Sequence, residues 1–186
     1  MLENLNIENI LFLDIETVSV VPDYQSLDER LKKLWDRKSE RIRQKDTDSP
    51  DSLFERAGIY AEFGKIICIC VGIFRNNELR IKAFYGDEEK QILQDFASLL
   101  NNYYSKPDHL LFAHNGNEFD FPYISRRMLI NGLRLPFLLD TAGRKPWEVN
   151  HLDTMELWKF GDFKNYTSLD LLAAVFDIPT PKDDID

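Results

Sequence analysis

Cysteine, long apolar runs and excess positive charge are all scarce in this 186-residue sequence. The two cysteines, Cys68 and Cys70, share one strand-like run, where neighbouring positions on one face suit a disulfide poorly. A zinc site would need further ligands, so we interpret them as ordinary core residues. No apolar run approaches the roughly 20 residues of a membrane span, and the N-terminus lacks the basic and apolar regions of a secretory signal. These absences predict a cytoplasmic protein.

The net charge of −9 argues against a protein that binds nucleic acid through a broad basic surface. The charge does not exclude an enzyme that binds nucleic acid through metal ions held by carboxylates in one cleft. In such a site the metal cations supply the positive field. A hydrophobic content of 44% with 30% charged residues is ordinary for a globular protein. We expect one domain over residues 1–186.

Two acids end the first apolar run of the sequence. We expect a buried strand over residues 9–15 with a charged tip. Because side chains alternate along a strand, Asp14 and Glu16 would point to one face. Two carboxylates held together there repel one another unless a cation lies between them, and such hard oxygen ligands suit Mg²⁺ or Mn²⁺. The alternative is that Asp14 simply caps the strand and Glu16 is solvated.

The rest of the pattern predicts an α/β fold with a mixed central β-sheet flanked by helices. Residues 20–58 differ in composition, carry a capping-box pattern from Ser26 to Glu29, and are expected to form a helical insertion over or beside the sheet. The elements expected after it are a hairpin (65–74 and 78–85), a helix (87–104), a strand (109–113), a helix (121–131), a strand or strand-to-helix junction (151–157) and a helix (168–176).

A second polar centre follows the strand expected at 109–113. His114 and Asn115 lie in a polar turn, and Asp120 begins the next helix, where the helix dipole tolerates a negative charge. Asp120 and Asn115 could instead be capping residues, with His114 a satisfied turn residue. Asp153 could approach the same place, although a structural role in a turn is favoured. Two acidic centres at strand ends in one small domain favour a catalytic interpretation.

Asp14-x-Glu16 resembles the first motif of the DEDD (DnaQ-like) 3′–5′ exonuclease superfamily. Asn115-x-x-x-Phe119-Asp120 resembles its second motif in the form found in family B DNA polymerases. The sequence is most similar to predicted 3′–5′ exonucleases related to the proofreading domain of those polymerases, over most of the chain outside residues 20–58. This resemblance implies a ribonuclease H-like fold and phosphodiester hydrolysis with two metal ions.

The resemblance also implies roles for individual residues. Asp14 would bridge two Mg²⁺ or Mn²⁺ ions, Glu16 would bind one of them and Asp120 would hold the other. The residues expected to place the terminal nucleotide are Thr17, His114, Asn115 and Phe119. The implied substrate is DNA with single-stranded or frayed 3′ ends, because unstacked bases can lie on aromatic and apolar side chains. RNA on the same fold stays open, and no polymerase partner can be named.

The superfamily needs a third motif, a Tyr or His followed four or five residues later by a fourth acid. Tyr166-Thr-Ser-Leu-Asp170 has the tyrosine spacing, but it begins a helix that resembles the one preceding this motif in related enzymes. Asp170 is therefore expected to serve the first turn of that helix. The third motif itself is expected beyond residue 186. Without a fourth acid, the alternative is a non-catalytic ribonuclease H-like module that binds nucleic acid or a partner protein.

Overall fold

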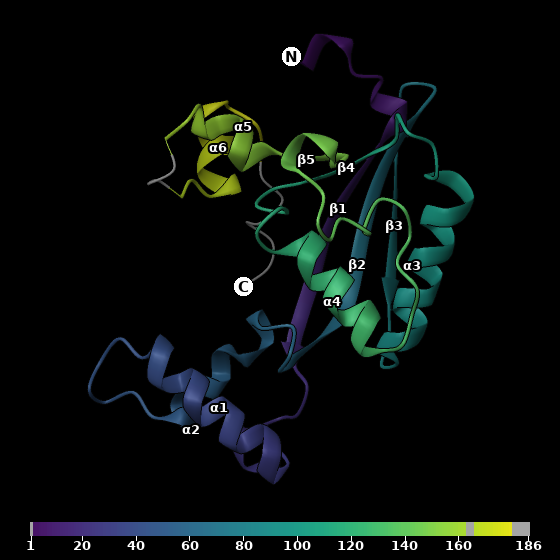
Figure 1. Ribbon diagram of the computed structural model, residues 1–186. Coiled ribbons are helices and arrows are strands. Elements are labelled where there is room, and N and C mark those ends of the chain that lie inside the picture. The colour runs from purple at the N-terminus through teal and green to yellow at the C-terminus, as the bar shows by residue number, and fades with distance from the viewer. Residues whose placement is uncertain (1, 163–165, 180–186) are drawn as a thin grey trace.

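The computed structural model describes residues 2–162 and 166–179 of the chain. A five-stranded mixed sheet of order β3-β2-β1-β4-β5 forms its centre (Figure 1). The strands are β1 (Ile10–Ser19), β2 (Gly64–Arg75), β3 (Glu78–Tyr85), β4 (Leu110–Ala113) and β5 (His151–Asp153). β2 runs antiparallel to β1 and β3, whereas β4 runs parallel to β1 and β5. The expected hairpin is confirmed, and the last expected strand is a junction between β5 and a helix.

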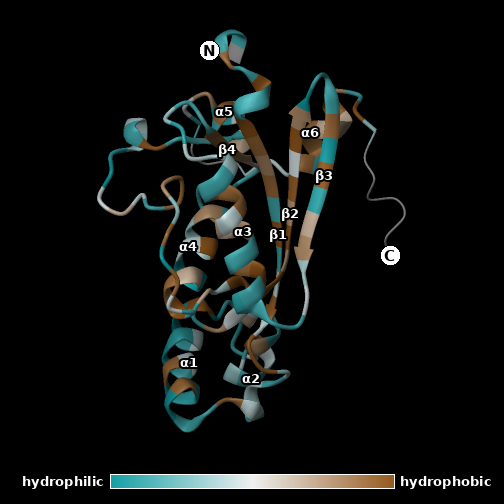
Figure 2. Cartoon of the chain, turned by 90° about the vertical axis from the view of Figure 1, so that its right-hand side faces the viewer, coloured by the Kyte–Doolittle hydropathy of each residue, from teal (hydrophilic) through white to brown (hydrophobic). Residues whose placement is uncertain are grey.

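Two of the helices cover one face of the sheet (Figures 1 and 2). The helices are α1 (Glu29–Ile42), α2 (Pro50–Leu53), α3 (Glu89–Tyr103), α4 (Asp120–Ile130), α5 (Thr154–Lys159) and α6 (Leu169–Val175). α3 and α4 form the covering layer, and α5 continues directly from β5. None of the helices in the described ranges is long and apolar enough to cross a membrane.

The main core lies between the sheet and the α3–α4 layer. Leu11, Leu13 and Ile15 of β1 are at most 6% exposed, because alternate side chains of the strand face the two helices. The intervening residues Asp14 and Glu16 are exposed on the opposite face. The hydrophobic pattern of β1 therefore determines which side of the sheet displays the acids.

β1 is longer than expected, and this corrects the prediction that Asp14 and Glu16 lie at its tip. The strand continues to Ser19 because β2 pairs with it along that whole length. The parallel neighbour β4 pairs with β1 only from Ile10 to Phe12. The acids thus lie in the middle of β1, beyond the residues that pair with β4.

Residues 20–58 form a helical unit beyond the end of β1 (Figure 1). Its members Leu27, Trp35, Leu53, Phe54 and Ala57 pack in a second core together with Phe63, which lies just before β2. Trp35 is fully buried, and its indole N–H donates to the carbonyl oxygen of Pro50 over 2.7 Å. We call residues 20–58 the α1–α2 unit.

The α1–α2 unit does not begin with the capping box expected from Ser26 to Glu29. The N-cap of α1 is Asp28, whose carboxylate accepts hydrogen bonds from the backbone N–H groups of Arg30 and Leu31. Ser26 belongs to the preceding turn, where its hydroxyl and backbone N–H both donate to Asp23. The prediction was wrong because an aspartate two residues nearer the helix supplies the same acceptor.

Candidate active site

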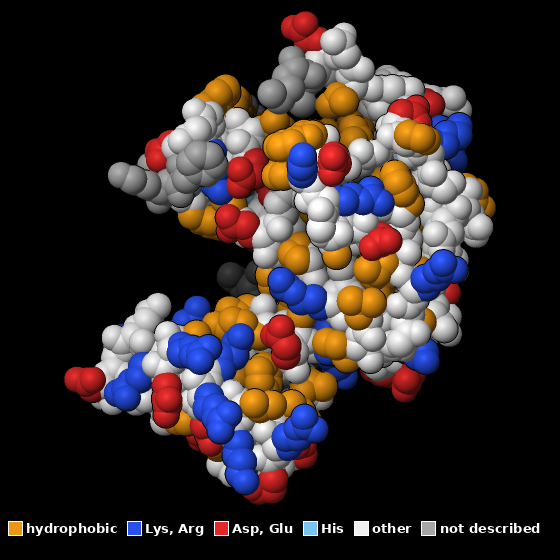
Figure 3. All heavy atoms as spheres, viewed as in Figure 1, with side chains coloured by type: hydrophobic (Ala, Val, Ile, Leu, Met, Phe, Trp, Pro, Cys, Tyr) orange, Lys and Arg blue, Asp and Glu red, His pale blue; other side chains and the backbone are white. Residues whose placement is uncertain are grey.

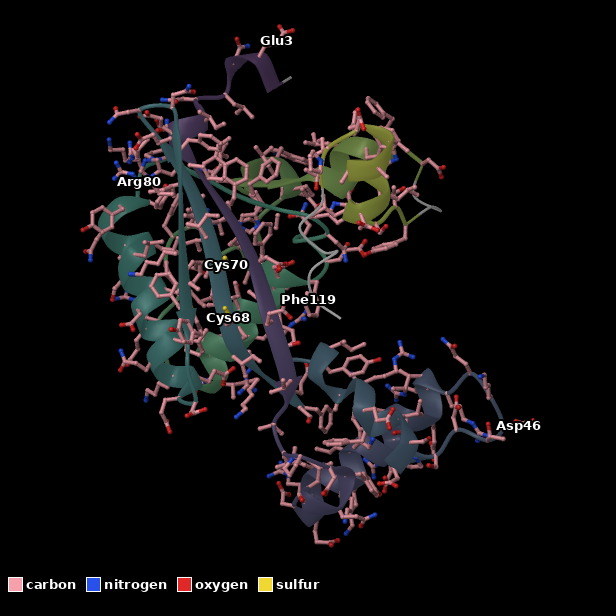
Figure 4. All side chains as sticks on the ribbon, turned by 180° about the vertical axis from the view of Figure 1, so that it is seen from behind. Glu3, Asp46, Cys68, Cys70, Arg80 and Phe119 are labelled. Carbon is pink, nitrogen blue, oxygen red and sulfur yellow. The ribbon has the colours of Figure 1, made fainter. Side chains whose placement is uncertain are left out.

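Asp14 and Glu16 lie on one face of β1, opposite two cysteines of β2. In the β1–β2 register, Asp14 pairs with Cys70 and Glu16 pairs with Cys68. Figure 4 shows both thiols along β2 beside β1, with Phe119 on the other side of β1. The acids therefore lie on a partly solvent-exposed face of the sheet, where water, ions or substrate can reach them.

The two cysteines are not core residues, which corrects the sequence interpretation. Both are free thiols with intermediate exposure on the acid-bearing face. Burial raises the pKa of Cys68, and the neighbouring Cys70 and the charges of Glu16 and Asp14 raise it further. Cys68 therefore stays protonated at neutral pH, so hard carboxylate oxygens are the charged donors of this face.

Thr17 is turned away from the two acids. An irregularity between Glu16 and Thr17 shifts the register, so that Thr17 pairs with the core residue Ile66. The Thr17 side chain faces the hydroxyl of Tyr123, a residue of α4, and acts to lower the pKa of that hydroxyl. Burial raises the pKa of Tyr123 to about 12, and its hydroxyl donates to the carbonyl oxygen of Gly58 over 2.7 Å. The structure thus places Thr17 in a joint between β1, α4 and the α1–α2 unit.

Asp120 meets β1 from the first turn of α4. Its side chain is 3% exposed, and Oδ1 accepts a hydrogen bond from the backbone N–H of Ile15 over 3.2 Å. Burial, together with the charges of Asp14 and Asp153, raises the pKa of Asp120 to about 7. The acids of β1 and α4 therefore converge on the stretch of β1 that β4 leaves unpaired.

The raised pKa of Asp120 predicts a pH-dependent cost in stability when no metal is bound. The folded protein retains a proton between the unfolded value of 3.8 and the folded value of about 7, so stability falls as pH rises through that window. A full shift would correspond to roughly 4 kcal/mol, which water access and relaxation would reduce to about 2 kcal/mol. In EDTA, Asp120→Asn should therefore gain roughly 1 kcal/mol of stability over wild type between about pH 5 and about pH 8, the part of the window that lies above pH 5. Urea denaturation of both proteins at both pH values measures this gain. A stability difference between variant and wild type that does not change with pH would contradict the prediction.

The turn after β4 holds Asn115 in a left-handed conformation, with φ of 61°. Asp153, at the end of β5, accepts hydrogen bonds from the backbone N–H groups of Asn115 (2.8 Å) and Asn117 (3.0 Å). Gly116 is needed because a Cβ there would lie 2.6 Å from Ala113 Cβ. The favoured structural role of Asp153 is confirmed, since its carboxylate shapes this turn.

The side chain of Asn115 carries a buried amide oxygen, Oδ1, in this turn. This oxygen has no hydrogen-bond partner within residues 2–162 and 166–179. A buried amide oxygen of this kind is costly unless something donates to it or binds it. Asn115 is therefore suited to contact a bound ion, water or nucleotide.

His114 and Phe119, both expected at the substrate, are partly occupied by contacts within the protein. His114 Nδ1 lies 2.7 Å from Thr154 Oγ1, and Nε2 lies 2.9 Å from the carbonyl oxygen of Thr167. Phe119 packs on Tyr123 with ring centroids 5.3 Å apart. His114 thereby ties the turn to α5 and to the segment before α6.

Tyr166 and Asp170, the candidate third motif, are both exposed, Tyr166 by 68%. Ser168 caps α6 through a hydrogen bond from the backbone N–H of Leu171, and Asp170 lies in the first turn of that helix. This is the local helix-start position that the sequence favours for Asp170.

The residues present fit a divalent metal ion in kind. Within the part of the chain that the structure describes, no three His, Cys, Asp or Glu side chains are already arranged to hold a metal ion. Mg²⁺, however, is usually held by one or two carboxylates together with water and substrate phosphates. Asp14 and Asp120 supply such a pair, and a cation would relieve the repulsion that raises the pKa of Asp120.

The sequence matches the family described as predicted 3′–5′ exonuclease related to the exonuclease domain of PolB, over residues 59–186. The chain belongs to this family. The match includes Asp120 and the turn before it, whereas β1 precedes the matched range. No curated relative matches the sequence.

Solved structures similar to this member of the PolB-related exonuclease family show its fold. The family B DNA polymerase of Pyrobaculum calidifontis has 14% identity and a TM-score of 0.50, over 94% of this chain and 19% of the polymerase. Exonuclease I of E. coli, in complex with a dA16 oligonucleotide, has 10% identity and a TM-score of 0.50, over 92% of this chain and 36% of the exonuclease. The chain thus spans about a fifth to just over a third of these proteins. Its fold is ribonuclease H-like.

Sequence reasoning missed Tyr123 as part of the site's framework. It lies three residues after Asp120 in α4. That helical spacing is equally typical of a residue that only packs in the core. Only the contact with Thr17 and Gly58 distinguishes it from the other apolar residues of α4.

Proposed function

We propose that this member of the PolB-related exonuclease family is a metal-dependent 3′–5′ exonuclease. It would hydrolyse phosphodiester bonds from the 3′ end of DNA, with single-stranded ends preferred. The observation that carries the proposal is the meeting of the buried Asp120 carboxyl with the stretch of β1 that bears Asp14 and Glu16. The family match and the exonuclease I structure in complex with an oligonucleotide support nuclease chemistry on DNA.

The protein's own groups would place the reacting phosphate. Asp14, Glu16 and Asp120 would hold two Mg²⁺ or Mn²⁺ ions, which when bound lower the pKa of an attacking water and stabilise the leaving 3′ oxygen. The Ile15 N–H orients the Asp120 carboxyl, and Asp153 orients the turn that carries Asn115. These hydrogen bonds keep the carboxylates and the Asn115 side chain in place before substrate arrives.

The proposal is tested by incubating the protein with a 5′-labelled single-stranded DNA and Mn²⁺. Hydrolysis from the 3′ end should give a ladder of progressively shorter labelled products, and EDTA should abolish it. Immediate release of a labelled mononucleotide would indicate the opposite polarity. An RNA of the same sequence and a blunt duplex in parallel reactions report on sugar and strand preference.

The exposed position of Tyr166 and Asp170 favours one rival, the non-catalytic module. A ribonuclease H-like module without a fourth acid at the site would bind nucleic acid or a protein partner and leave every substrate intact. Absence of shortening with Mn²⁺ and with Mg²⁺, on both DNA and RNA, would support this rival and contradict the exonuclease.

A further inference from the structure

The solvent face of α1 carries a line of cations in a protein whose net charge is −9. α1 contains six Lys or Arg against three Asp or Glu, a net charge of +3 over its 14 residues. Four of the six define what we call the basic stripe: Arg30, Lys33, Arg37 and Arg41. At 100° per residue these positions fall within an arc of roughly 80°, on the side of the helix opposite the buried Trp35.

The basic stripe is distinct from the other two cations of α1. Lys32 lies 5.0 Å above the ring of Tyr24, and Lys38 lies 3.9 Å above the ring of Tyr60. All four stripe residues are exposed, and none of them makes an ion pair with a residue that the structure describes. Figure 3 shows Lys and Arg side chains gathered over the α1–α2 unit. Acids of α1 therefore border the stripe, but among the described residues none of them forms an ion pair with it.

The α1–α2 unit is fixed to the strand that carries the acids. The backbone N–H of Val20 donates to the carbonyl oxygen of Phe63 over 2.8 Å. Gly58 packs so closely on β1 that a Cβ there would lie 3.1 Å from the backbone of Val18. Tyr123 of α4 closes the same joint through its hydrogen bond to Gly58. These contacts attach the unit that carries the stripe to the end of β1, the strand that bears Asp14 and Glu16.

We infer that the basic stripe binds the phosphate backbone of the DNA strand whose 3′ end enters the active site, an inference that rests on the proposed function. A surface of net negative charge repels a polyanion, so contacts away from the metal site need local cations. Three of the four are arginines, whose planar guanidinium matches phosphate oxygens in bidentate contacts. The stripe is roughly 16 Å long at 1.5 Å per residue, long enough to follow several consecutive phosphates.

The test uses a variant with Gln at all four stripe positions, R30Q/K33Q/R37Q/R41Q. Glutamine keeps the helix propensity of the replaced residues, so α1 should stay folded, which circular dichroism checks. The matched control R80Q/K90Q/K106Q/R134Q removes four positive charges from exposed residues elsewhere on the surface. Affinity for a fluorescent single-stranded oligonucleotide and for a duplex of equal length is measured in EDTA over a range of salt concentrations.

The stripe variant should lose about tenfold or more in affinity at low salt, and its slope of log K against log salt should fall by roughly 0.7 for each phosphate that is no longer neutralised. The control variant should keep an affinity close to that of wild type. Whichever oligonucleotide, single-stranded or duplex, loses affinity in the stripe variant is the form whose backbone lies on the stripe. Equal losses in both variants, unchanged binding by the stripe variant, or no binding by wild type would each overturn the inference. Because no hydrolysis occurs in EDTA, a failure of the proposed function would appear only in the ladder assay.

Discussion

Replacing Asp14 by Asn should reduce the rate of DNA hydrolysis by roughly a thousandfold or more, because loss of groups that merely orient metal ligands already costs 10–100-fold. Asp14 is exposed on the acid face of β1, and its charge reaches both Asp120 and Cys68. The amide retains the shape of the carboxyl group but cannot provide the negative charge that holds a divalent cation. The ladder assay with saturating Mn²⁺ measures the loss.

The same substitution should leave the fold intact. Removing the Asp14 charge also removes a repulsion that raises the pKa of Asp120, so the metal-free variant should be at least as stable as wild type. Mn²⁺ should raise the melting temperature of wild type and raise that of the variant less. Asp87→Asn, at an exposed position outside the site, serves as the matched control and should keep wild-type activity. Full activity in Asp14→Asn would show that the metal ions are held elsewhere.

Replacing Arg127 by Met should lower the free energy of unfolding by about 3–5 kcal/mol, the usual cost of leaving one partner of a buried ion pair alone. Arg127 of α4 donates to both carboxylate oxygens of Glu89 on α3 and to the carbonyl oxygen of Ala61. Glu89 also accepts from the backbone N–H of Ile66 over 2.8 Å. Burial disfavours the charged form of Glu89, but these hydrogen bonds outweigh it and lower its pKa. The pair thus joins α3, α4 and β2 beneath the site.

Urea denaturation at neutral pH measures this effect. Arg126→Met, at the adjacent exposed position of α4, is the matched control and should change the stability by no more than about 0.5 kcal/mol. The double variant Arg127→Met/Glu89→Leu should recover part of the loss, because it no longer buries an unpaired carboxylate. A loss in Arg127→Met no larger than that in Arg126→Met would show that the ion pair contributes nothing to the fold.

Local pattern was enough to predict most secondary structure and the candidate acids. Alternation along β1 places Asp14 and Glu16 on one face whatever surrounds them, because the period of a strand is two. The apolar spacing of α3 and α4 likewise specifies which side of each helix is buried. The N-cap of α1 was misplaced because Ser26 and Asp28 both offer a suitable acceptor, and only the Asp23 contact decides between them.

Contacts between distant segments decided the rest. The length of β1 depends on its pairing with β2, and an irregularity in that pairing sets Thr17 opposite Ile66. The exposure of Cys68 and Cys70 depends on which face of the sheet the helices cover. The approach of Asp120 to Ile15 spans 105 positions of sequence and exists because β4 stops at Ala113. The sequence by itself thus determined the fold class and the kinds of side chain that the candidate site offers. The tertiary structure decided which donors meet, because long-range pairing and burial, rather than local propensity, set the distances and the pKa of Asp120.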